Sequence, residues 1–279
     1  MANLFSGLEA FGLGNLSGMD IYEDKEKENQ KKREEEDKPS FSEEDAIFEK
    51  TYTCPVCDQE FKYKTVKSGK VKLQSLDSDL RPIYQNMDPL KYDAIVCPSC
   101  GFAALNRFFK YVSSGQAQLI KTNITAAFRG INESGGIFSY DDSIARHKLA
   151  LVNSIVKKAK TSERAYTCLK TAWVIRGKSE TLPKNLPDYN QQVSGLEKEE
   201  LEFLSKAYVG FEEAFSKEDF PMCGMDEVTI TLLMAELARR LGKNDEANRW
   251  ISKVLISRDA NERIKQKARD IKEKMKEHK

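Results

Sequence analysis

The sequence predicts a mainly α-helical protein, in which a helical array follows a small β-rich module. Three observations support this fold class. Two Cys-Pro-x-Cys motifs enclose a segment rich in β-favouring residues, and apolar residues recur at helical spacing through most of the chain after Gly101. Small residues also stand where two paired helices would approach closely. We therefore expect a cysteine-bearing β module followed by packed helices.

The charge balance and the lack of long apolar runs argue against some classes of protein. The 279 residues contain 45 Lys and Arg against 44 Asp and Glu, so no overall attraction to nucleic acid is expected. No apolar run approaches the roughly 20 residues of a membrane-spanning helix, and the N-terminus lacks the features of a secretory signal. We expect a cytoplasmic protein without a membrane partner, in which paired cysteines are metal ligands rather than disulfides.

The first part of the chain divides into an apolar peptide and a charged linker. Residues 1–22 carry leucine and phenylalanine side chains interrupted by glycines, which disfavour a stable helix. Residues 23–46 begin with a run of charged and amide side chains that cannot form a core, and we interpret them as a flexible linker. Two interpretations of the peptide stay open: a frayed terminus, or a short docking motif that orders on a partner or on the protein's own surface.

Residues 47–101 are predicted to form a zinc-ribbon-like module. Thiolates at i and i+3 of a tight turn supply half of a tetrahedral zinc site, with Zn–S distances of about 2.3 Å. Gly101 permits the left-handed turn that aims backbone N–H groups at sulfur. Four thiolates leave no open coordination position, which favours a structural ion. The four predicted ligands, with 39 residues between the two motifs, are Cys54, Cys57, Cys97 and Cys100.

The cysteines allow other interpretations. The motifs could be independent redox dithiols, but no thioredoxin-like βαβ pattern surrounds either. A redox sensor that releases zinc when its thiolates are oxidised is a further alternative. Cys168 lies on an apolar helical stripe and is expected to pack in the core, whereas Cys223 lies in a Pro/Gly break where a structural role is expected.

Residues 102–279 are predicted to form helices. The first is expected over 102–112, capped by the zinc ribbon. Within residues 229–259, Ala235 and Ala247 stand where the two helices of a tetratricopeptide-type repeat pack closely. Such pairs stack into an array with a concave face. The alternative is an ordinary helical bundle in which these alanines are coincidental.

The sequence shows no set of catalytic residues. His147 lies within a predicted helix and His278 is next to last, and there is no HExxH motif, phosphate-binding Gly-rich loop or Gly-x-Ser-x-Gly motif. Asp141 and Asp142 precede a helix and are interpreted as capping groups. We therefore expect no enzymatic activity and no small-molecule substrate.

A basic hairpin offers an alternative function. Residues 62–75 contain five lysines and no acid, with Tyr63 among them. Such a hairpin, from Lys62 to Lys72, suits phosphate groups, and an aromatic ring can stack on bases. Because the chain as a whole is nearly neutral, we favour the other interpretation, in which these lysines lie on a strand face in contact with solvent.

The order of the motifs resembles that of a known family. CPVCDQEF is followed by a polar insertion, by YDAIVCPSCGFAA and later by LLMAELARRLGKNDEANRWISKVL. This order is similar to the bacterial family called domain of unknown function 2225, over residues 50–270. The resemblance implies a zinc ribbon followed by tetratricopeptide-like helices in a cytoplasmic bacterial protein. It implies no activity, because the function of the family is itself uncharacterised.

These patterns together predict a non-enzymatic zinc-binding scaffold. We expect its tetratricopeptide-like domain (102–279) to bind a peptide or protein partner in a groove. The alternative is a nucleic-acid-binding zinc ribbon that uses the hairpin from Lys62 to Lys72.

Overall fold

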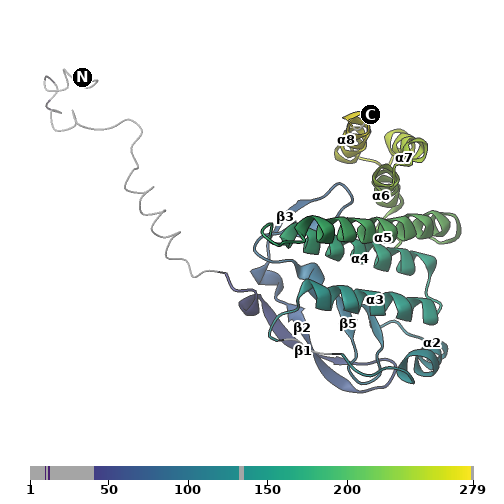
Figure 1. The fold of residues 1–279 in the computed structure, drawn as a ribbon. Coiled ribbons are helices and arrows are strands. Elements are labelled where there is room, and N and C mark those ends of the chain that lie inside the picture. Colours follow the sequence, from purple (N-terminus) through teal and green to yellow (C-terminus); the bar gives the residue numbers. More distant parts are fainter. Residues whose placement is uncertain (1–9, 11, 13–40, 132–134, 278–279) are drawn as a thin grey trace. The chain divides into compact units, whose positions relative to one another are not determined.

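The computed structural model describes residues 10, 12, 41–131 and 135–277 (Figure 1). The described residues from Ser42 onward belong to one compact unit. The predicted apolar peptide (1–22) lies outside the described residues except for Ala10 and Gly12, and so does the predicted linker up to residue 40. The unit that begins at Ser42 contains both cysteine motifs and the helices.

The β-rich part of this unit consists of three antiparallel hairpins, each a separate two-stranded sheet within the described residues. Residues 61–66 alternate between apolar and polar side chains at their start, which predicts a half-buried strand. The structure agrees there, because Phe61 and Tyr63 are buried while Lys62 is exposed. A short helical turn (Pro89–Tyr92) leads into the third hairpin. The hairpins are β1 (Ile47–Thr53) with β2 (Glu60–Val66), β3 (Leu73–Leu76) with β4 (Pro82–Tyr84), and β5 (Ala94–Val96) with β6 (Ala103–Leu105).

Two segments differ from the sequence prediction. The helix expected over 102–112 is wrong, because β6 occupies its first part and turns follow over residues 106–110. Residues 102–105 are all buried, so their apolar side chains form a continuous run in which helical and strand periodicities cannot be distinguished. Pairing with β5 across the second cysteine motif makes this run a strand. Residues 76–91 contain two prolines and little periodicity, which predicts a long excursion between strands. The structure places β4 within them, and β4 returns to pair with β3.

Most of the described chain after residue 113 is helical, which confirms the mainly α fold class. In Figure 1, α3, α4 and α5 lie side by side, while α6, α7 and α8 form a second group that is seen end-on. No described helix combines the length and apolar character needed to cross a membrane. The helices are α2 (Ser114–Ile120), α3 (Tyr140–Val156), α4 (Thr161–Thr181), α5 (Tyr189–Lys217), α6 (Glu227–Arg240), α7 (Asn244–Ile256) and α8 (Glu262–Glu277).

Helix α4 lies at the centre of the helical core. Its residues 171–177 are all buried, because α3 and α5 both pack against it. The α4–α5 contact is close at Gly210 of α5, where a Cβ atom would lie 2.8 Å from the Cβ of Ala165. Cys168 is buried in this core, as predicted, and burial raises the pKa of its thiol to about 11.

The start of α3 bears out the capping role predicted for Asp142 but not for Asp141, and both residues lie within the first turn of the helix rather than before it. Ser139 is the N-cap residue, and its side chain accepts a hydrogen bond from the backbone N–H of Asp142 at 3.0 Å. The Asp142 side chain in turn accepts from the backbone N–H of Ser139 at 3.0 Å. Asp141 lies in the same first turn, where a negative charge is favourable to the helix dipole.

Gly210→Ala is expected to destabilise the protein. The added methyl group would lie 2.8 Å from the Ala165 Cβ, so α4 and α5 would have to move apart; overpacking of this kind costs about 1–3 kcal/mol. Gly195→Ala is the matched control on the same helix. Its Cβ would meet nothing within 4 Å, and alanine is the better helix former by roughly 1 kcal/mol. Because the gain in helix propensity applies to both variants, denaturation followed by circular dichroism should give a lower midpoint for Gly210→Ala than for Gly195→Ala, and equal midpoints would contradict the packing argument.

Candidate metal centre

The first cysteine motif forms the turn between β1 and β2. The backbone N–H of Cys54 donates to the carbonyl oxygen of Gln59 at 3.0 Å, and the N–H of Asp58 donates to the carbonyl of Cys54 at 2.9 Å. The N–H of Val56 points at the Cys54 sulfur, with an N···Sγ distance of 3.5 Å. Asp58 adopts the left-handed conformation, with φ at 60°. The turn therefore places Cys54 and Cys57 on the same side of the hairpin.

The second motif forms the same kind of turn between β5 and β6. The N–H of Cys97 donates to the carbonyl of Phe102 at 2.8 Å, and the N–H of Gly101 donates to the carbonyl of Cys97 at 3.0 Å. Gly101 has φ at 74°, and a Cβ there would lie 2.6 Å from the ring of Phe128. The left-handed turn predicted at Gly101 is confirmed. Asp58 is its counterpart in the first turn, and sequence reasoning missed it.

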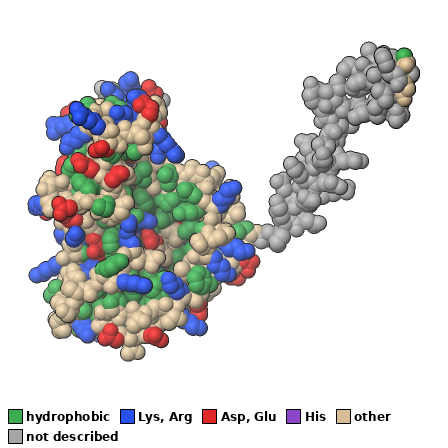
Figure 2. Space-filling model, turned by 180° about the vertical axis from the view of Figure 1, so that it is seen from behind, with side chains coloured by type: hydrophobic (Ala, Val, Ile, Leu, Met, Phe, Trp, Pro, Cys, Tyr) green, Lys and Arg blue, Asp and Glu red, His purple; other side chains and the backbone are tan. Residues whose placement is uncertain are grey.

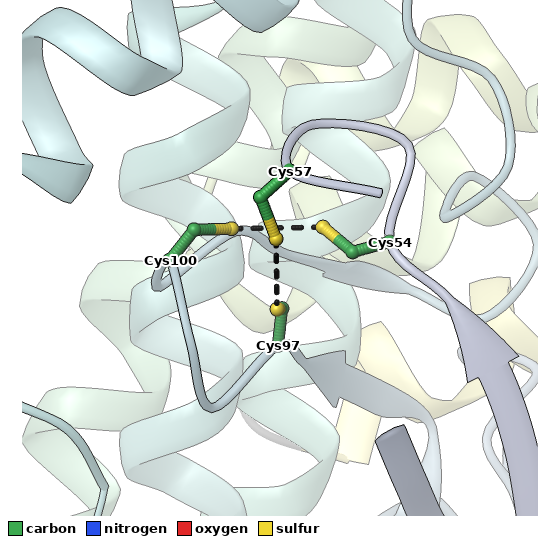
Figure 3. Close-up of side chains that lie close together, drawn as sticks. All are labelled: Cys54, Cys57, Cys97 and Cys100. Carbon is green, nitrogen blue, oxygen red and sulfur yellow. Dashed lines mark hydrogen bonds between the residues drawn. The ribbon is translucent and has the colours of Figure 1, made fainter. Parts of the chain in front are cut away.

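The two turns bring the four predicted cysteine sulfurs together (Figure 3). All four Sγ atoms lie within 4.8 Å of one another. The Cys54–Cys100 and Cys57–Cys97 distances are 3.5 and 3.7 Å. A tetrahedron with metal–sulfur bonds of about 2.3 Å has sulfur–sulfur edges of about 3.8 Å. The cluster therefore has the size of a four-thiolate metal site. Three of its cysteines are buried and Cys57 is half-buried.

Contacts among the sulfur atoms make the thiols ionise unequally. Hydrogen bonds with Cys100 and Cys54 lower the pKa of Cys97 to about 2. Hydrogen bonds with Cys54 and Cys97, together with burial, raise the pKa of Cys100. A divalent cation that accepts sulfur ligands would allow all four groups to be thiolates at once, and its binding would release their protons.

Two polar side chains outside the motifs support the second turn. Asn153 of α3 donates to the carbonyl oxygen of Gly101 at 3.1 Å, and Thr125 donates to the carbonyl of Cys100 at 2.9 Å. Asn153 is fully buried. Asn153 is a polar residue on the buried face of a predicted helix. Because buried polar groups need hydrogen-bond partners, this position was the sequence signal that could have identified its role. The contact of Asn153 fixes the cysteine turn against α3, and that of Thr125 fixes it against the helical turn Lys121–Thr125.

The other residues singled out in the sequence lie outside the cluster. Cys223 donates from its sulfur to the carbonyl of Ser162 at 3.3 Å. His147 is buried in α3, where its Nδ1 lies 2.8 Å from the carbonyl oxygen of Ser143, and burial lowers its pKa. His278 lies outside the described residues.

Two lysines of the basic hairpin and its tyrosine are bonded to their own chain. Lys64 donates to the carbonyl of Gly135 at 2.6 Å, and Lys67 donates to the carbonyl of Asp45 at 2.9 Å. Tyr63 is buried and donates to the carbonyl of Ala94. Its ring therefore presents no face on which a base could stack.

One comparison with known proteins gives a match, and it includes both the metal centre and the helices. The model of a family described as "Uncharacterized protein conserved in bacteria (DUF2225)" matches residues 47–275. The chain belongs to this family. The resemblance predicted over residues 50–270 is thereby confirmed, and the match runs from the first residue of β1 into α8. No curated protein and no solved structure matches the chain.

Gly101→Ala is expected to weaken metal binding, whereas Asp58→Gly should not. Both positions are left-handed, but a methyl group at Gly101 would meet the Phe128 ring and add a conformational cost of about 1–2 kcal/mol. That cost corresponds to about a tenfold loss of affinity. Glycine at position 58 keeps the same turn without strain. Competition with a chromogenic chelator measures both affinities, and equal affinities for the two variants would contradict the role of the left-handed turn.

Proposed function

We propose that this protein is a non-enzymatic zinc-binding scaffold whose helical array binds a peptide or protein partner. The observation that carries the proposal is the closed set of four cysteine sulfurs. An ion held by four thiolates has no coordination position left for substrate or water, so it stabilises the fold and does not activate a reactant.

The ligand chemistry supports zinc as the ion. Four thiolates in a tetrahedron suit zinc or iron, and paired cysteine turns at the ends of hairpins are typical of structural zinc sites. A reducing compartment such as the cytoplasm would keep these cysteines available as ligands.

The α6–α7 pair supports the tetratricopeptide-like interpretation of the helices. Ala235 and Ala247 are both fully buried, and the two helices pack closely. Gly242 turns between them with φ at 71°. Helix α8 packs against both α6 and α7 and buries Ala268 and Ile271, as a terminal capping helix would. An array of this kind offers its helical surface to a partner.

Cys97→Ser is expected to lose zinc and lower the thermal midpoint. A serine hydroxyl is a poor replacement for a thiolate ligand, and the β1–β2 and β5–β6 hairpins would lose their common ion. Cys223→Ser is the matched control, because its hydroxyl can keep the hydrogen bond to Ser162. Zinc content by atomic emission and thermal melts by circular dichroism should separate the two variants. A Cys97→Ser protein that lost zinc but kept the wild-type midpoint would refute the structural role of the ion.

Photo-crosslinking in bacterial cells should locate the partner on the helices. A benzophenone amino acid at Val209, which is 53% exposed on α5, is expected to capture one discrete polypeptide. The same group at Phe48, which is 42% exposed on β1, should capture none. A polypeptide captured only at Phe48, or at neither site, would count against the proposal. A nuclease-sensitive product at Phe48 would support nucleic-acid binding by the β-rich part instead.

A further inference from the structure

The tip of the β3–β4 hairpin is buried among the helices. Figure 1 shows this hairpin beside α4 and α5. Asp79 at the tip is fully buried, and its neighbour Leu80 packs against the helical core. Aspartate is almost never fully buried unless it is paired. The tip therefore has specific partners on the helices.

Asp79 is held by side chains from two helices. The Arg176 guanidinium of α4 donates to its two carboxylate oxygens at 2.5 and 3.2 Å, and the indole N–H of Trp173 donates to it at 3.2 Å. Arg240 of α6 lies 3.8 Å from the same carboxylate. Burial raises the pKa of Asp79, but the hydrogen bonds and charge of Arg176 outweigh it and leave that pKa below its usual value. The group is thus bound as a carboxylate.

The residues on either side of Asp79 are also bound. Asp77 accepts from Arg176 at 3.0 Å, and the Ser78 hydroxyl donates to Glu236 of α6 at 2.7 Å. Glu200 of α5 accepts from the Nε of Arg176 at 2.8 Å and so orients the guanidinium. We call the helical residues that receive the tip the arginine face: Trp173, Arg176, Glu200, Glu236 and Arg240.

Beside the tip, Arg81 is buried and donates to the Glu180 carboxylate of α4 at 2.7 and 2.8 Å, whereas the strands of the hairpin contribute little to holding the tip in place. β3 and β4 form a two-stranded sheet of their own, and such a hairpin is at best marginally stable. Leu73 and Leu76 of β3 are 50% and 45% exposed. Leu80 adopts φ at 69°, a conformation that is unfavourable for a bulky side chain. The tip is therefore kept in place by its contacts with the arginine face and the helical core, as a bound peptide would be.

We propose that the arginine face is a recognition site for an acidic peptide segment of the pattern Asp-x-Asp-Leu, which the chain's own hairpin tip occupies in this structure. The proposal deepens the proposed scaffold function and rests on it, because it names the chemistry of the partner. A planar guanidinium that donates two hydrogen bonds to one carboxylate gives geometric specificity, and the indole N–H adds a third donor.

A partner segment would have to compete with the tethered tip. A segment on a short tether acts at an effective concentration of about millimolar. A free peptide of the same sequence should therefore bind the wild-type chain weakly, and removal of the tip carboxylate should reveal the site. In Asp79→Ala, Arg176 keeps Glu200 and Asp77 as partners, so no unpaired buried cation is created there.

The test uses the full-length, metal-loaded chain and a fluorescent peptide with the sequence of residues 75–82, SLDSDLRP. Fluorescence anisotropy is expected to show at least about tenfold tighter binding to Asp79→Ala than to the wild type. A peptide with both aspartates changed to asparagine should lose that gain. Inorganic phosphate at the same concentration should not displace the acidic peptide; if it does, the face is a general anion site and the proposal fails.

A second variant and a second measurement keep the test decisive if Asp79→Ala does not fold. Leu80→Ala removes most of the apolar contact of the tip, keeps a Cβ atom in the left-handed conformation and leaves every residue of the arginine face, so it too should bind the acidic peptide more tightly than the wild type. In the wild type, saturating peptide should speed amide hydrogen exchange over residues 73–84 and leave residues 47–66 unchanged. If neither variant binds and exchange does not change, the tip is a permanent part of the fold. That result would overturn this inference alone, because capture of a partner at Val209 tests the scaffold function separately.

Discussion

Four sulfur atoms from two hairpins of separate sheets lie together in one cluster, and the β-rich part is arranged around it. Neither β1–β2 nor β5–β6 has a third strand in the described residues, and isolated hairpins are at best marginally stable. The second cysteine turn is also bound to α3 through Asn153. Closure of the cluster thus aligns both hairpins with the first long helix, and α3 in turn packs on α4.

The cysteine site could be predicted from the sequence because its information is local. Each Cys-Pro-x-Cys motif defines its own tight turn. A tetrahedral structural metal site needs four ligands, which explains why two such turns should meet. The long helices were also predictable, since their apolar periodicity persists over several turns. The segment after Gly101 was not, because a short buried run fits either state and only pairing with β5 decides between them.

The hairpin tip shows a different limit of sequence reasoning. Asp79 looked like part of a polar excursion, and its partners Trp173, Arg176 and Arg240 lie far along the chain in two different helices. No local spacing encodes such an arrangement. A buried ion pair is also weak evidence for stability, because desolvation offsets much of the attraction. Its clearer effect here is to require one arrangement of α4, α5 and α6 around the tip.

The position of this tip in the chain bears on how the protein forms during synthesis. The N-terminal part of a chain leaves the ribosome first during synthesis. Both cysteine motifs and Asp79 emerge before Arg176, and Arg240 emerges last of these. The β-rich part can therefore close first, with the aspartate still in water. The later helices then assemble around a carboxylate that is already tethered beside them, so co-translational folding favours the self-bound form over capture of an outside segment.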